Sequence, residues 1–119
     1  APQMPEIKAE QYTLEFANRD TWNEGVDDDS RKGFQVLKLF KEHGFEGEIG
    51  IGVSDVHVNE IESPELIRDR ILYSAKALDD PTKVYVNPDC GLRTRTREVS
   101  FDKIRSIVKG AELAREEIK

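Results

Sequence analysis

The sequence predicts an α/β fold with parallel strands, namely the last three βα units of a (β/α)8 TIM-type barrel, incomplete as an isolated chain. Three short segments with strand-like alternation begin near residues 12, 48 and 83, and each is followed by a helical pattern. Repeated strand–helix units give parallel strands joined by right-handed crossovers. Because a complete barrel of eight such units takes about 250 residues, the 119 residues hold roughly three of them.

Composition limits the organisation and the partners. Residues 1–10 contain two prolines and little apolar periodicity, which indicates a tail or a cut connection, and residues 11–119 form the partial barrel. The net charge of −6 argues against a nucleic-acid partner, which requires a basic face. Apolar runs are only a few residues long, so no membrane span is expected. A single cysteine excludes an internal disulfide and indicates a cytoplasmic location.

The first unit opens with residues 12–16, where apolar and polar residues alternate strictly, as in a strand with one buried face. After an acidic loop, either Asp29 or Ser30 is expected to cap a helix that carries apolar residues between Phe34 and Phe40. Gly44 is placed to end that helix, because glycine readily adopts the left-handed conformation of a C-terminal cap.

The second and third units repeat this arrangement. Residues 48–53 form the second predicted strand, and Ser63 followed by Pro64 is a strong signal for the start of a helix. Residues 83–86 form the third predicted strand, and Ser100 is expected to cap the last helix. The apolar residues of that helix lie at helical spacing: Ile104, Ile107, Val108, Ala111 and Ala114.

Each predicted strand has one apolar face, which is expected to pack against the surrounding helices. The other face carries small or polar residues and is expected to line the barrel lumen: Thr13, Glu15, Gly50, Gly52, Tyr85 and Asn87. Glycines and polar groups at the carboxyl end of a lumen suit an active-site mouth. A small open doubly wound sheet is the alternative, since it is also built from strand–helix units.

A chemically capable residue lies at the end of each predicted strand: Glu15, then Asp55 and His57, then Asp89 and Cys90. The carboxyl ends of barrel strands converge on one rim, so a carboxylate, an imidazole and a thiol would lie together, as in a metal or nucleophile site. Taken singly, His57 is more often an ordinary loop histidine and Cys90 a small buried side chain.

Glu15 lies between Leu14 and Phe16 in the first predicted strand and is expected to be buried. A buried carboxylate without a partner is costly. We therefore expect it to meet either a metal or an arginine, such as Arg19 or Arg93.

Three segments resemble the cobalamin-independent methionine synthase family, in the order that the family has. Residues 84–95, Val-Tyr-Val-Asn-Pro-Asp-Cys-Gly-Leu-Arg-Thr-Arg, resemble the segment that supplies a zinc-bound cysteine. Residues 49–57 resemble the segment before it, and residues 12–16 resemble the strand that carries the family's glutamate ligand. The Asn-Pro-Asp-Cys-Gly string is specific, whereas the two other segments are weaker by themselves.

The resemblance implies the C-terminal part of a methyltransferase that moves a methyl group to the thiol of homocysteine and forms methionine. It implies Zn as the cofactor, Cys90 and Glu15 as metal ligands, and His57 as the catalytic residue for proton transfer. Asp55 is implied to hold the amino acid substrate or to orient His57. The methyl donor would be a methylated folate or another methyl carrier. A related alternative is alkyl transfer to another thiol, such as coenzyme M.

The chain departs from the family pattern before the glutamate strand. The family has a His-x-Cys pair of zinc ligands there, and this sequence has no histidine or cysteine before His43. A catalytic zinc normally has three protein ligands, so two are too few. We expect a fragment whose remaining barrel is supplied in cis or in trans, since three strands leave unpaired edges. The alternative is a catalytically incomplete binding or assembly module.

Overall fold

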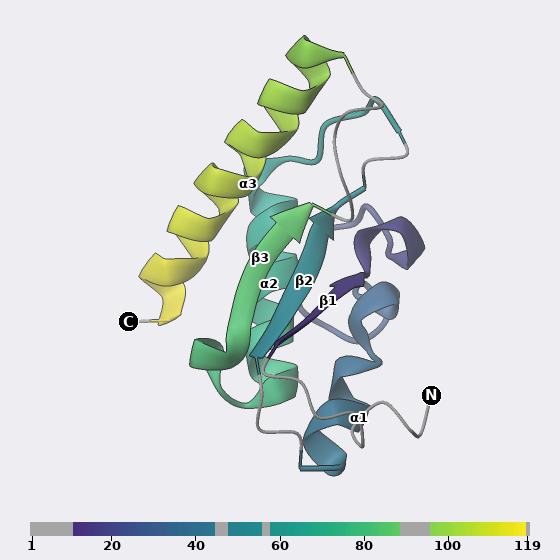
Figure 1. The fold of residues 1–119 in the computed structure, drawn as a ribbon, viewed down its shortest axis with the longest axis vertical. Helices are drawn as coiled ribbons and strands as arrows, with labels where there is room; N and C mark the ends of the chain where they lie inside the picture. The colour runs from purple at the N-terminus through teal and green to yellow at the C-terminus, as the bar shows by residue number, and fades with distance from the viewer. Residues whose placement is uncertain (1–10, 45–47, 56–57, 89–95, 119) are drawn as a thin grey trace.

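The computed structural model describes residues 11–44, 48–55, 58–88 and 96–118. Three parallel strands pair in the order β1-β2-β3: β1 (Gln11–Glu15), β2 (Glu48–Ser54) and β3 (Val84–Pro88). Three α-helices accompany them (Figure 1): α1 (Leu37–Glu42), α2 (Pro64–Leu78) and α3 (Arg97–Ile118). Short 3-10 helices are η2 (Ala17–Arg19), η3 (Lys32–Phe34) and η4 (Pro81–Lys83). Among these described helices, none has the length and apolar character that a membrane span requires.

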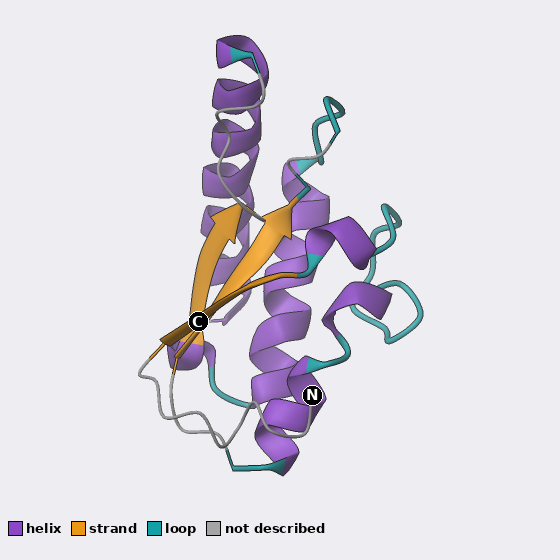
Figure 2. Cartoon of the chain, turned by 45° about the vertical axis from the view of Figure 1, so that its right-hand side comes forward, coloured by secondary structure: helices purple, strands orange, loops and turns teal. Residues whose placement is uncertain are grey.

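The helices lie on one face of the sheet. The strand order follows the chain order without reversal, and right-handed crossovers then place successive helices on the same side. In Figure 1, α2 lies behind the strands, and the turned view of Figure 2 shows it to one side of them. Ile49, Ile51 and Val53 of β2 belong to the hydrophobic core and are 0% exposed, as the alternation predicted. A doubly wound sheet carries helices on both faces, so the described part of the chain does not have that arrangement.

The first predicted helix is broken into two pieces. Lys32–Phe34 form η3, and α1 begins only at Leu37. The backbone N–H of Gly33 donates to Asp20 Oδ1 at 3.1 Å, and a Cβ on Gly33 would lie 2.5 Å from the carbonyl oxygen of Phe16. The turn is therefore held tightly against the segment that follows β1, and this contact interrupts the helix.

The predicted helix ends were partly correct. Neither Asp29 nor Ser30 caps α1, which has no side-chain cap, so that prediction is wrong. Gly44 does follow α1, with φ of 70° in the left-handed region. Ser63 also caps α2 as predicted, because its Oγ accepts from the backbone N–H of Leu66 at 3.1 Å.

The start of α3 differs from the prediction. The helix begins at Arg97, so Ser100 lies inside its first turn and is not the cap. Thr96 takes that role, since its Oγ1 accepts from the backbone N–H of Val99 at 3.2 Å. Threonine is itself a good N-cap residue, and the capping preference alone did not choose between the two positions.

The buried face of α3 also differs from the predicted apolar stripe. Ile104 and Val108 are 46% and 53% exposed, although Ile107 and Ala114 are buried as expected. The helix instead buries small and polar residues against the rest of the chain: Lys103, Ser106 and Gly110. Gly110 determines this choice, because a Cβ there would lie only 2.5 Å from side-chain atoms of Ile67 on α2.

Replacing Gly110 by alanine is expected to lower the free energy of unfolding by about 1–3 kcal/mol through overpacking. The added carbon would lie 2.5 Å from Ile67 and 2.8 Å from the carbonyl oxygen of Pro64. This clash outweighs the gain in helix propensity, which is at most about 1 kcal/mol. Urea unfolding measures the difference. Lys109→Ala, at an exposed neighbouring position, should change the free energy by less than about 0.5 kcal/mol. Unchanged or higher stability of Gly110→Ala would contradict this helix packing.

Candidate functional site

The carboxyl ends of the three strands form one edge of the sheet. Across it, Glu15 of β1 is in register with Gly52 of β2, which is in register with Asn87 of β3. Adjacent strands lie about 4.8 Å apart, so the backbones of Glu15 and Asn87 are separated by roughly 10 Å. Gly52 has no side chain and is buried in this row. The row therefore places Glu15 and Asn87 on either side of a residue without a side chain.

A second row lies one repeat earlier along the strands. Thr13 is in register with Gly50, which is in register with Tyr85. Tyr85 is 45% exposed although it lies within a strand, because no described helix covers this face of the sheet. The central strand thus has glycine in both rows, which agrees with the predicted small-residue face.

Glu15 is exposed, so the prediction that it is buried is wrong. It is the last residue of β1, and the chain turns into η2 directly afterwards. Phe16, predicted as the end of the same strand, is 3% exposed and packs against Phe34 with ring centroids 5.2 Å apart. Because Glu15 is exposed, its carboxylate does not need a metal to offset burial. Its candidacy as a metal ligand rests on its position in the register row.

The other predicted site residues are described only in part. His57 and Cys90 lie outside the described residues, as does Asp89. Within the described ranges, no group of three or more histidine, cysteine, aspartate or glutamate side chains is arranged to hold a metal ion. Within the described residues, the fold therefore brings together the backbone positions of the strand ends, not a complete ligand set.

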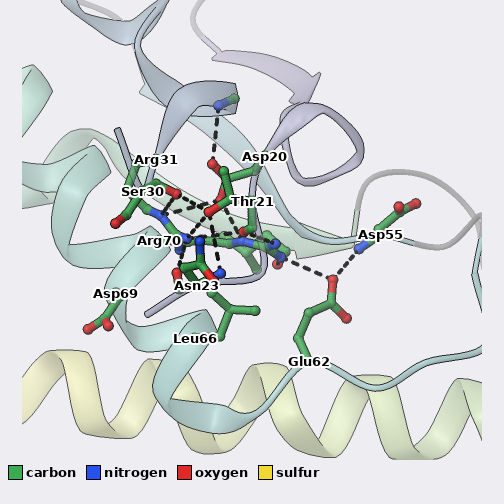
Figure 3. Close-up of polar contacts among 12 residues, drawn as sticks. Asp20, Thr21, Asn23, Ser30, Arg31, Asp55, Glu62, Leu66, Asp69 and Arg70 are labelled. Carbon is green, nitrogen blue, oxygen red and sulfur yellow. Dashed lines mark hydrogen bonds and ion pairs between the residues drawn. The ribbon is translucent and has the colours of Figure 1, made fainter. Parts of the chain in front are cut away.

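Asp55 directly follows β2 and is 9% exposed. Its backbone N–H donates to Glu62 Oε2 at 2.7 Å. Figure 3 shows its own carboxylate pointing away from Glu62. The residue is thus fixed through its main chain, and its side chain extends in a different direction.

Glu62 belongs to a buried polar cluster, and Figure 3 shows it beside Asp55 and Arg70. The residue is 1% exposed. Besides Asp55, it accepts from Ser54 Oγ at 3.1 Å, from Arg70 Nη1 at 3.0 Å and from Lys103 Nζ at 3.4 Å. Two cations and two uncharged donors thus surround one carboxylate, which is what a buried charge requires.

Arg70 connects this cluster to the segment that follows β1. From α2, its Nη1 also donates to the carbonyl oxygen of Val53 at 2.7 Å. Its Nε donates to Asp20 Oδ2 at 2.9 Å, and its Nη2 donates to the carbonyl oxygen of Thr21 at 3.1 Å. One guanidinium therefore holds the end of β2 and the chain after β1 at a fixed separation.

Arg31 is the second buried guanidinium of the cluster. Its Nε lies 3.4 Å from Asp20 Oδ2, and its Nη2 donates to the carbonyl oxygens of Thr21 and Asn23. Its Nη1 has no hydrogen-bond partner among the described residues. Burial lowers the pKa of the Arg31 guanidinium, and the carboxylate of Asp20 opposes that shift. Arginine stays protonated at neutral pH in either case.

One feature of the sequence indicates this cluster: a charged residue, Arg70, stands among the apolar residues of a helix. Arg70 lies four residues after Leu66 and one before Ile71, on the buried face of α2. A charged residue at an apolar position of a helix must find a buried counter-ion. Its counter-ion Asp20 is fifty residues away in the chain, so the pair could not be identified from local pattern.

A separate hollow of about 630 Å³ lies between α1 and α2. One ion pair lies in its wall: Lys38 Nζ lies 2.7 Å from Asp28 Oδ1, and Tyr73 OH donates to the same oxygen at 2.7 Å. Lys38 first, and then Tyr73, lower the pKa of Asp28, whereas burial raises the pKa of Tyr73. The lining holds three acidic residues and three lysines, so the hollow carries no net charge that would select a charged ligand.

Residues 26–113 match the family described as "Cobalamin-independent synthase, Catalytic domain". The chain belongs to this family. The match covers the segment from the loop after η2 to the last turns of α3, including the ends of β2 and β3 and the cluster residues Arg31, Glu62, Arg70 and Lys103.

Curated relatives of this cobalamin-independent synthase chain are methionine synthases. That of Thermoplasma acidophilum is 49% identical over 109 residues, which are 88% of this chain and 32% of the relative. That of Saccharolobus solfataricus is 35% identical over 123 residues, which cover 100% of this chain and 32% of the relative. The chain thus spans about a third of the length of the curated relatives it matches.

The fold of this synthase family chain is also found in a solved structure. A B12-independent methionine synthase from Shewanella sp. W3-18-1, in complex with selenomethionine, matches with a TM-score of 0.76 and 23% sequence identity. The match covers 98% of this chain and 30% of that structure's chain. At this identity the likeness establishes the fold alone.

Replacing Asp20 by alanine is expected to lower the free energy of unfolding by about 3–5 kcal/mol, because two buried guanidinium groups would lose their carboxylate. Both side chains of the Asp20–Arg70 pair are 0% exposed. The matched control is Asp102→Ala, which removes an exposed pair with Arg105 and should cost less than about 1 kcal/mol. Equal losses for the two variants, measured by urea unfolding, would show that the buried cluster contributes little.

Proposed function

We propose that this chain forms the last three strand–helix units of a (β/α)8 barrel, in a zinc-dependent methyltransferase that transfers a methyl group to homocysteine and forms methionine. The observation that carries the proposal is the family match over residues 26–113, together with 49% identity to a methionine synthase. The fold likeness to a second methionine synthase agrees with it.

The one-sided helix layer and the sequential strand order support the barrel. In a barrel every helix lies outside the sheet, and the inner face is free for the lumen. Within the described residues, β1 and β3 are the edge strands and each pairs on one side only. Edges of this kind are normally covered or paired in a folded protein.

Exposed apolar residues next to the β3 edge support the same arrangement. Phe101, Ile104 and Val108 of α3 are 60%, 46% and 53% exposed, and their spacing places them on one side of the helix. An apolar groove of about 130 Å³ between β3 and α3 includes Val84 and Ile118 in its lining. A further strand beside β3 and a further helix beside α3 would cover both, and the rest of the barrel supplies them in cis or in trans.

The register row supports a zinc site at the carboxyl ends of the strands. Glu15 lies at one end of the row, and Asn87, three residues before Cys90, lies at the other. Gly52, which has no side chain, lies between them in the row. A carboxylate and a thiolate are both suitable zinc ligands, and Glu15 and Cys90 would hold the ion. The remaining protein ligands come from the part of the barrel outside this chain.

The chemistry follows from these positions. Zinc, when bound, lowers the pKa of the homocysteine thiol, so that a thiolate is available at neutral pH. Asp55 holds the amino group of homocysteine, since a carboxylate at the edge of the site pairs with an ammonium group. His57, two residues further, transfers a proton during the methyl transfer. The methyl donor is a methylated folate or another methyl carrier.

Zinc content is the direct test of the ligand assignment. In the intact protein, Cys90→Ser and Glu15→Gln are each expected to lower bound zinc strongly after dialysis, because each removes one protein ligand. Glu24→Gln, which changes an exposed glutamate outside the row, should leave the zinc content unchanged. Full zinc occupancy in Cys90→Ser would contradict the proposed metal site.

Substrate choice separates the proposal from its alternatives. The intact protein should transfer a methyl group to homocysteine much faster than to coenzyme M, and Asp55→Asn should raise the KM for homocysteine by about tenfold. Transfer to coenzyme M alone would favour an alkyltransferase for another thiol. A protein that assembles with its partner but binds no zinc and transfers no methyl group would be a binding module.

A further inference from the structure

We propose that Lys103 of α3 is a positioning residue for His57, because it fixes the loop after β2 in which His57 lies. The inference deepens the proposed function and rests on the proton-transfer role given there to His57. The observation that carries it is the 2.7 Å hydrogen bond from Lys103 Nζ to the carbonyl oxygen of Glu60, three residues after His57 in the sequence. The donating side chain is 0% exposed.

The loop between β2 and α2 is closed at its base by one carboxylate. Ser54 Oγ and the backbone N–H of Asp55 donate to the two oxygens of Glu62 at 3.1 and 2.7 Å. The end of β2 and the segment just before α2 therefore lie side by side, and the chain turns back between them. Residues 58–63 belong to neither a helix nor a strand, so secondary structure does not fix the path of this part of the loop.

Helix α3 holds the returning half of this loop from a different strand–helix unit. Lys103 Nζ binds the carbonyl oxygen of Glu60 and also lies 3.4 Å from Glu62 Oε1. One turn later, Ser106 Oγ donates a short hydrogen bond to the carbonyl oxygen of Glu62. Lys103 and Ser106 are both buried and share a helix face, since residues three apart are neighbours on a helix. The loop of the second unit is thus fixed by the helix of the third.

The reach of Lys103 depends on the close approach of α3 to α2. Gly110 lies two turns after Lys103, and a Cβ there would lie 2.5 Å from Ile67 and 2.8 Å from the carbonyl oxygen of Pro64. A larger residue would push the two helices apart, and Lys103 and Ser106 would then lose their carbonyl partners. This contact explains why α3 buries polar residues on the side that faces the loop.

The burial of a lysine at this position indicates its role. Removing an ammonium group from water costs several kcal/mol, and an apolar side chain of similar length would pack there without that cost. The charge of Glu62 is also neutralised by Arg70, whose Nη1 lies 3.0 Å from its carboxylate. Lys103 differs from Arg70 in that it also binds the main chain at Glu60. That contact restrains the backbone on the side of the loop that leads back to His57.

A restrained loop matters for a residue that transfers a proton, because the two atoms that exchange the proton must come within hydrogen-bond distance. A displacement of about 1 Å can lower a reaction rate by about a hundredfold. The proposed zinc ligands Glu15 and Cys90 lie on other segments. Loss of the Lys103 contact is therefore expected to slow the chemical step and to leave the zinc content unchanged.

The test uses the intact zinc-containing protein with Lys103→Met, which keeps the length of the side chain and removes its charge. The kcat for methyl transfer to homocysteine should fall at least about tenfold. Hydrogen exchange of a peptide spanning residues 58–62 should be about tenfold faster, because a charge-assisted hydrogen bond to the loop is lost. The matched control is Lys109→Met, at an exposed position of the same helix, which should alter neither quantity.

A second variant keeps the test decisive if Lys103→Met does not fold. Ser106→Ala removes only the hydrogen bond to the carbonyl oxygen of Glu62, and the same changes are expected to a smaller extent. Unchanged exchange in the folded variant would overturn the restraint of the loop by α3. Faster exchange with unchanged kcat would overturn its link to His57.

A double-mutant cycle separates positioning of His57 from a general structural role. His57→Ala removes the group that Lys103 positions, so Lys103→Met should change kcat by less than about twofold in that background. Equal losses of kcat in the two backgrounds would overturn the proposal. If His57→Ala retains the wild-type kcat, or if the wild-type protein transfers no methyl group to homocysteine, the proposed function fails. The exchange result still decides whether Lys103 restrains the loop.

Discussion

Buried charges that pair with one another determine how the loops after β1 and β2 pack against α2 and α3. Arg31, Arg70 and Lys103 are each 0% exposed, and the carboxylates of Asp20 and Glu62 lie between them. Removing such groups from water costs several kcal/mol each, and only close opposite charges with good hydrogen bonds recover that cost. The loops after β1 and β2 and the first half of α3 therefore have one arrangement in which all of these charges are paired.

This constraint explains features of the chain that apolar packing does not. Hydrophobic contacts are tolerant of small shifts, whereas a guanidinium with hydrogen bonds at 2.7–3.1 Å allows little movement. The close approach of Gly33 to the segment after β1 belongs to the same assembly, since its N–H donates to Asp20. These hydrogen bonds hold the loops at the strand ends in fixed positions relative to the strands.

The sequence predicted those parts of the fold that depend on local signals. Strand alternation identified the core residues of β2, and the Ser63–Pro64 pair identified the start of α2. The position of Glu15 at the end of a strand was predicted correctly, but the prediction that it is buried was wrong, because burial depends on which face of the sheet the helices cover. The face of α3 was wrong for a similar reason, since Gly110 and its contact with Ile67 are seen only in three dimensions.

The residues of the candidate site also fall into those that local sequence signals identify and those that they do not. Asp55 was identified because it follows a strand and matches a family segment, whereas Glu62 and Arg70 were not, since their partners lie up to fifty residues away. Ion pairs across such separations leave no periodic pattern in a single sequence. The zinc ligands and His57 remain predictions, because His57 and Cys90 lie outside the described residues and Glu15 alone does not form a metal site.

The exposed apolar side of α3 has a thermodynamic consequence. A complement that binds only the folded chain stabilises it by RT ln(1 + [L]/Kd), which adds about 1.4 kcal/mol for each tenfold excess over Kd. Covering Phe101, Ile104 and Val108 also contributes hydrophobic free energy that the chain alone does not have. In the proposed barrel, the stability of this polypeptide is therefore not a fixed property of its sequence, and it would rise with the effective concentration of the surface that covers α3.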